Sequence, residues 1–108
     1  MMFMNEYDIE DAREDFSNDP VYGPATATLY NLMNWTNNNS DGWAYWKKPL
    51  QAARGLMEFI EGEKGRRRNW RAEDPNEREV RAAYKKSLSA IKAFKTRQGA
   101  KFEIVEAS

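Results

Sequence analysis

The sequence contains neither cysteine nor histidine. Without cysteine, a disulfide framework and a thiolate metal site are both excluded. Without histidine, the chain lacks the side chain most used for zinc ligation and for proton transfer near neutral pH. The remaining carboxylates, lysines and tyrosines show no converging catalytic motif. The sequence therefore predicts no catalytic residues, no metal site and no cofactor, and we expect a protein that is not an enzyme.

Long apolar runs are also missing. No stretch approaches the roughly 18 apolar residues of a membrane helix, and the N-terminus turns acidic at Glu6 before a signal-peptide region develops. We therefore expect a cytoplasmic protein with no membrane partner. A mean hydropathy of −0.92 would suit a disordered chain, but four Trp, five Tyr and five Phe indicate a folded core. At 108 residues, the chain is expected to form one helical domain over 1–108.

The formal net charge is zero, but the charge is segregated along the chain. Acidic side chains dominate residues 1–61 and basic ones dominate residues 62–108. Two interpretations remain open. The two parts could pack against each other, or the second part could present a basic face to an acidic partner.

Apolar periodicity predicts helices near residues 6–16, 24–36, 49–61 and 75–98. We expect an all-α fold, a small bundle of three to four helices with a short strand or an extended tail at residues 101–105. If that tail is ordered, Phe102 and Val105 should pack against the body or a second copy. The residues expected to face the core are Ile9, Ala12, Phe16, Ala25, Leu29, Leu32, Met33, Thr36, Leu50, Ala53, Met57, Ile60, Val80, Tyr84, Leu88, Ile91 and Phe94.

Local signals set the expected helix ends. Pro24 is suited to open the second helix, and Gly62 to end the third. Asp74 is expected to cap the last helix, with Pro75 as its first residue, and Gly99 to end it. The composition of residues 37–42 indicates a turn, and residues 62–73 are expected to form an irregular basic loop.

Three patterns resemble known sites only superficially. Residues 37–42 have the spacing of a calcium loop, but Lys48 stands where the bidentate carboxylate belongs. The G-x-x-G at residues 62–65 lacks the flanking strands of a nucleic-acid-binding KH domain. Ser89 and Lys92 have the spacing of one class of serine nucleophile, but they fall inside a predicted helix without a companion motif. None of the three predicts a site.

One basic cluster resembles a binding site. Lysine and arginine neutralise phosphates, and an interleaved Trp can stack on an unpaired base. The cluster could therefore bind nucleic acid, bind an acidic protein, or pair with the acidic part of its own chain. It consists of Lys64, Arg66, Arg67, Arg68, Trp70 and Arg71.

The densest aromatic group is Trp43, Tyr45 and Trp46. In a helical turn, Trp43 and Trp46 would lie on one side. The group either fills the core between the second and third helices or forms an exposed hot spot for a protein partner.

A longer pattern across about Pro20 to Gly62 resembles small proteins encoded by actinobacterial phages and prophages. The resemblance implies a context, a phage-type accessory protein in a bacterial host cytosol, and no reaction or functional residue. The basic cluster lies beyond it. It rests on Trp35-Thr36, Ser40-Asp41-Gly42-Trp43, Tyr45-Trp46, Lys48-Pro49, Ala52-Ala53-Arg54 and Leu56-Met57-Glu58.

These observations favour a non-enzymatic accessory protein that binds and modulates a host or phage macromolecule through protein–protein contacts. The alternative is a DNA- or RNA-binding protein that uses residues 64–71 and the adjacent helix. The sequence leaves open the identity of the partner and whether the chain forms a homo-oligomer.

Overall fold

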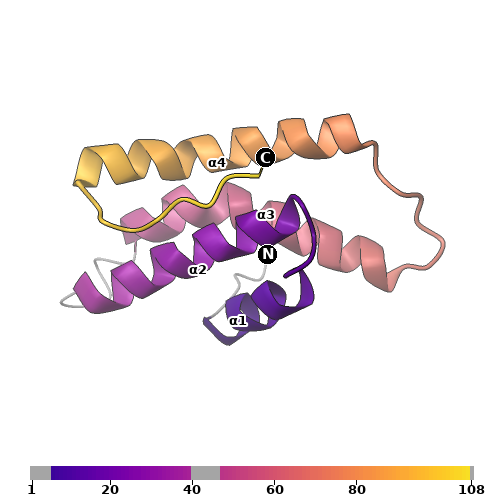
Figure 1. The fold of residues 1–108 in the computed structure, drawn as a ribbon, viewed down its shortest axis with the longest axis horizontal. Coiled ribbons are helices and arrows are strands. Elements are labelled where there is room, and N and C mark those ends of the chain that lie inside the picture. The colour runs from indigo at the N-terminus through magenta and orange to yellow at the C-terminus, as the bar shows by residue number, and fades with distance from the viewer. Residues whose placement is uncertain (1–5, 40–46, 108) are drawn as a thin grey trace.

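The computed structural model describes residues 6–39 and 47–107, and within these ranges it contains four α-helices. They are α1 (Glu6–Asp15), α2 (Tyr22–Asn39), α3 (Lys47–Arg68) and α4 (Glu77–Gln98). The helix α3 packs against both α2 and α4, while α1 packs on α2 (Figure 1). The three longer helices run roughly along the 45 Å long axis of the molecule. The all-α bundle expected from apolar periodicity is confirmed.

The helix faces expected to point inward form the core. All but two of the predicted core residues are buried, and the exceptions, Leu50 and Val80, are partly buried against the same cluster. Buried hydroxyls in α2 find backbone partners: Thr26 donates to the carbonyl oxygen of Tyr22, and Thr36 to that of Leu32, each at 2.9 Å. Among the described residues, no buried side-chain nitrogen or oxygen lacks a hydrogen-bond partner.

The start of α2 differs from the prediction. The Asp19 carboxylate accepts the backbone N–H groups of Val21 and Tyr22 at 2.9 and 2.8 Å. These bonds satisfy donors that have no partner within the helix. The prediction that Pro24 opens the helix was wrong, because Asp19 caps the helix earlier and leaves Pro24 within the first turn.

The end of α2 also differs. Residues 37–39, predicted as part of a turn, form the last helical turn, where the Asn39 amide donates to the Trp35 carbonyl oxygen at 2.8 Å. Residues 40–42 of that predicted turn lie outside the described residues, as do Trp43, Tyr45 and Trp46.

Gly62 does not end α3, and residues 62–68 are not a loop. The helix continues through Gly62 and Gly65 to Arg68. Each glycine costs a helix interior about 1 kcal/mol relative to alanine. Ion pairs made by Glu63, Arg66 and Arg67 offset this loss of helix stability.

Asn76, not Asp74, caps α4. The Asn76 side chain accepts the backbone N–H of Arg78 at 2.8 Å. The Asp74 carboxylate instead accepts a hydrogen bond from Arg66 at 3.0 Å. At the other end, Gly99 adopts φ 58°, and its backbone N–H bonds carbonyl groups of the last turn, so the predicted glycine stop is confirmed.

Replacing Asn76 by alanine should therefore lower the free energy of unfolding by about 0.5–2 kcal/mol, the usual cost of losing a cap. Asp74→Ala removes only an ion pair with a largely exposed carboxylate, and should cost about 0.2–1 kcal/mol. Urea denaturation of both variants measures the difference. A larger loss for Asp74→Ala would contradict the assigned cap.

The C-terminal segment, residues 100–107, is extended and lies along α2 and α4 (Figure 1). The Thr28 hydroxyl both donates to the Val105 carbonyl and accepts the Val105 N–H, at 3.0 and 2.8 Å. The Tyr84 hydroxyl donates to the same carbonyl at 3.2 Å. Phe102 is buried, with its ring centroid 6.1 Å from that of Trp35. The tail thus packs on the body, as expected. The ring of Phe102 is buried, and the hydroxyls of Thr28 and Tyr84 hold the backbone of Val105.

Candidate interaction surface

The last two turns of α3 carry most of the basic cluster, and two of its arginines are engaged by carboxylates. The Glu63 side chain is only 5% exposed and accepts a hydrogen bond from Arg66 Nε. Arg66 Nη1 also bonds Asp74 Oδ1 at 3.0 Å. The hydrogen bond to Glu63 raises the pKa of Arg66 above its usual range. Arg66 therefore ties the end of α3 to the segment that leads into α4.

Arg67 ties α3 to the start of α2. Its Nη2 lies 3.1 Å from Asp19 Oδ2, and its Nε lies 3.8 Å from Glu63 Oε2. Its guanidinium carbon lies 4.4 Å from the centroid of the Phe16 ring. Arg67 thus joins the basic part of the chain to the acidic part, as the first interpretation of the segregated charge supposes.

Tyr22 lies beside this network. Its ring stacks on Phe59 with centroids 4.6 Å apart. Burial, reinforced by the negative charges of Glu63 and Asp19, raises the pKa of Tyr22 to about 12. The phenol therefore stays neutral across the physiological pH range and serves as a packing residue.

The other four residues of the cluster have a different environment. Lys64, Arg68 and Arg71 form no ion pair with any described residue. Trp70 is 83% exposed, and it is the only large hydrophobic residue exposed in the described part of the chain. The Arg71 guanidinium carbon lies 4.9 Å from the centroid of the Trp70 ring. We call Arg68, Trp70 and Arg71 the tip.

The backbone around the tip is hydrogen bonded. The N–H of Asn69 donates to the Arg66 carbonyl at 3.1 Å, and the N–H of Ala72 donates to the Asn69 carbonyl at 2.9 Å. The Asn69 side chain accepts the N–H of Arg71 at 3.2 Å. Residues 69–76 lie at one end of the long axis (Figure 1). The fold therefore presents an indole and two guanidinium groups at the extremity of the molecule.

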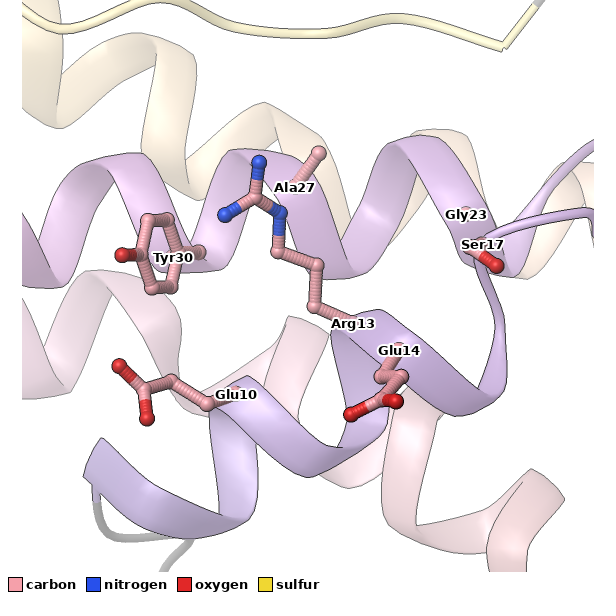
Figure 2. A pocket seen from close by; sticks show the side chains of 7 residues that line it. All are labelled: Glu10, Arg13, Glu14, Ser17, Gly23, Ala27 and Tyr30. Atoms are coloured by element: carbon pink, nitrogen blue, oxygen red, sulfur yellow. The ribbon is translucent and has the colours of Figure 1, made fainter.

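A groove between α1 and α2 was not predicted from the sequence. It measures about 510 Å³ and is lined by Glu10, Arg13, Glu14, Ser17, Gly23, Ala27 and Tyr30. Figure 2 shows Arg13 reaching from α1 toward α2 between the two walls. Its guanidinium carbon lies 4.3 Å from the centroid of the Tyr30 ring. The acidic composition of residues 6–15 was the one sequence feature that could have indicated this groove. It does not show which acidic residues lie beside the second helix.

The Ser89-x-x-Lys92 pattern lies within α4. Ser89 donates its hydroxyl to the Lys86 carbonyl at 2.7 Å within α4, which is the ordinary behaviour of a helical serine. No group of three metal-ligating side chains occurs among the described residues. None of the four helices is long and apolar enough to cross a membrane.

In comparisons with known protein families, with curated proteins and with solved structures, no match to this chain was found. The resemblance to phage and prophage proteins therefore stays a prediction.

Proposed function

We propose that this protein is a non-enzymatic, phage-type accessory module that binds a host or phage protein through the tip. The observation that carries the proposal is the exposure of Trp70 beside Arg71 on a hydrogen-bonded turn. Tryptophan and arginine are the residues most enriched at the energetic centres of protein interfaces. An indole exposed to water contributes no hydrophobic free energy, whereas a partner that covers Trp70 removes its apolar surface from water.

Charge around the tip favours a protein partner over nucleic acid. Arg66 and Arg67 are held by carboxylates, which leaves three cations of the original five. Glu73 and Glu79, which form no ion pair with a described residue, follow in the same stretch of chain and are exposed. These carboxylates repel a phosphate backbone, and a net charge of zero gives no long-range attraction to a polyanion.

Capture from a bacterial lysate treated with nuclease, followed by titration of the purified partner, tests the proposal. Trp70→Ala should weaken binding about thirtyfold or more, because truncating a central Trp anchor costs about 2 kcal/mol or more. Lys85→Ala serves as the control, since Lys85 is exposed on α4 away from the tip. A partner that binds Trp70→Ala as tightly as the unaltered protein would refute the proposal.

Nucleic-acid binding is the second candidate, favoured by the stacked Arg71–Trp70 pair, which resembles a platform for an unpaired base. Arg68→Ala with Arg71→Ala should then reduce the log–log salt slope of binding by somewhat under two units. Arg67→Ala should not contribute, because Arg67 is paired with Asp19. A gel shift at two salt concentrations measures this slope. Weak binding that these substitutions do not change would eliminate this candidate.

A further inference from the structure

The α1–α2 groove is acidic on one side and aromatic on the other. Glu10 and Glu14 line it from α1, four residues apart and therefore on one helix face. Both are exposed, and neither forms an ion pair with a described residue. Tyr30 and Ala27 line it from α2 (Figure 2). Arg13 lies between the two walls, so the groove offers two carboxylates and a guanidinium packed on an aromatic ring to a ligand that carries positive charge and an apolar ring.

The tip has the complementary chemistry. It offers two guanidinium groups, Arg68 and Arg71, which have no carboxylate partner in the described part of the chain, and the exposed indole of Trp70. The tip lies at one end of the long axis, whereas α1 lies beside the middle of the molecule (Figure 1). Within one chain, neither Arg68 nor Arg71 forms an ion pair with Glu10 or Glu14.

We propose that the tip of one copy of this protein docks into the α1–α2 groove of a second copy. Arg68 and Arg71 of the docking copy lie against Glu10 and Glu14 of the receiving copy. The indole of Trp70 stacks on the open face of the Arg13 guanidinium, whose other face lies on Tyr30. A guanidinium between two aromatic rings is a favourable cation–π arrangement. The inference rests on the proposed role of the tip as a binding surface, and it names a partner for that surface.

The size of the groove and the charge pattern support this occupant. The groove has a volume of about 510 Å³ and opens to solvent, so side chains of a second copy can reach it. The receiving residues belong to the acidic part of the chain and the docking residues to the basic part. Segregation of charge in a chain whose net charge is zero then steers copies together head to tail.

Tip and groove are different surfaces, so the contact is heterologous, and each added copy brings a new tip and a new groove. Such contacts build open chains or rings and do not stop at a two-fold dimer. One indole and two arginines bury little area, and interfaces below about 1,200 Å² are weak. The association should therefore depend on concentration and decrease with salt, which screens exposed charges.

Two variants of the full chain, each with one surface removed, test the inference. The groove variant carries Glu10→Lys and Glu14→Lys with an intact tip. The tip variant carries Arg68→Ala, Trp70→Ala and Arg71→Ala with an intact groove. In sedimentation velocity at low salt, the mean mass of the unaltered protein should rise with concentration beyond that of a dimer. Each variant alone should stay monomeric. An equal mixture should form a species of two chains only, because it contains one intact tip for each intact groove.

A control variant with the same change of charge, Glu58→Lys and Glu103→Lys, should associate as the unaltered protein does, since both residues are exposed and belong to neither the groove nor the tip. Circular dichroism should show unchanged helicity in every variant. If a variant is unfolded, Glu14→Gln and Trp70→Phe take its place and should each weaken the association.

Three results would overturn the inference: a monomeric unaltered protein up to millimolar concentration, a plateau at two chains, or an equal mixture that stays monomeric. If the protein is monomeric but Trp70→Ala still abolishes capture of another protein, the proposed function stands and only the self-association falls. If the copies associate as described but no other partner depends on Trp70, the proposed function falls instead.

Discussion

Replacing Ile91 by alanine should lower the free energy of unfolding by about 2–5 kcal/mol. Ile91 is fully buried at the middle of the apolar stripe of α4, which packs against α3. The substitution removes methyl and methylene groups from water-free surroundings and leaves a cavity that the three long helices can close only in part. Domains of this size have a total stability of about 5–15 kcal/mol, so the loss is a large fraction of it.

Urea denaturation followed by circular dichroism measures this effect, with the m-value as a check that the unfolded state is unchanged. Lys85→Ala on the exposed side of α4 is the matched control, and it should change the stability by less than about 0.5 kcal/mol. Equal stability of Ile91→Ala and the unaltered protein would contradict the helix register on which the fold depends.

The register of α4 could be predicted because several independent signals agree there. Apolar residues recur at helical spacing from Tyr84 to Phe94, acidic residues fill the first turn, and Gly99 ends the helix in the left-handed conformation. Where pattern, charge and cap point to the same element, a sequence specifies its structure locally. The inward faces of α1 and α2 were predicted from apolar periodicity alone, since the signals for the ends of α2 were misleading.

The extent of α3 could not be predicted because tertiary contacts override its local signal. Two glycines within four residues indicate a helix end when they are considered alone. Continuation to Arg68 depends on the buried Glu63 and on the pair between Arg67 and Asp19, residues 48 positions apart in the chain. Helix propensity contains no information about partners at that distance.

The two Asp-Pro pairs show how similar local signals acquire different roles. Asp19 precedes Pro20 and caps α2, although that helix was expected to begin at Pro24. Asp74 precedes Pro75 and was expected to cap α4, yet its carboxylate pairs with Arg66 and Asn76 takes the cap. The role of each aspartate depends on its tertiary contacts, with Arg67 for Asp19 and with Arg66 for Asp74, and the local sequence contains no information about these contacts.

The candidate site was predicted as a set of residues but not as a surface. Composition identified the cations from Lys64 to Arg71, and the exposed Trp70 was among the residues singled out. Composition could not separate arginines held by carboxylates from those without an ion pair, because Glu63 appeared as one more charge in a polar segment. The buried carboxylate of Glu63 contacts Arg66 and Arg67, which therefore stabilise the fold, whereas the tip residues remain on the surface.

Replacement of three glycines by alanine should change the free energy of unfolding in different directions, lowering it at Gly23 and raising it at Gly62 and Gly65. A Cβ at Gly23 would lie 2.9 Å from the backbone carbonyl oxygen of Phe16, closer than real Cβ atoms come, so the α1–α2 connection would have to move. Overpacking of this kind costs about 1–3 kcal/mol. A Cβ at Gly62 or Gly65 would meet nothing within 4 Å, because both positions are exposed in α3.

Gly62→Ala and Gly65→Ala should therefore each raise the free energy of unfolding by about 0.5–1 kcal/mol, the helix preference of alanine over glycine. Gly23→Ala should lower it despite the same preference, since Gly23 also lies in a helix. Chemical denaturation of the three single variants compares them directly, each serving as the control for the others. Destabilisation by Gly62→Ala would mean that this segment is the irregular loop that its composition suggests, and a stabilising Gly23→Ala would show that α1 does not pack so closely on the start of α2.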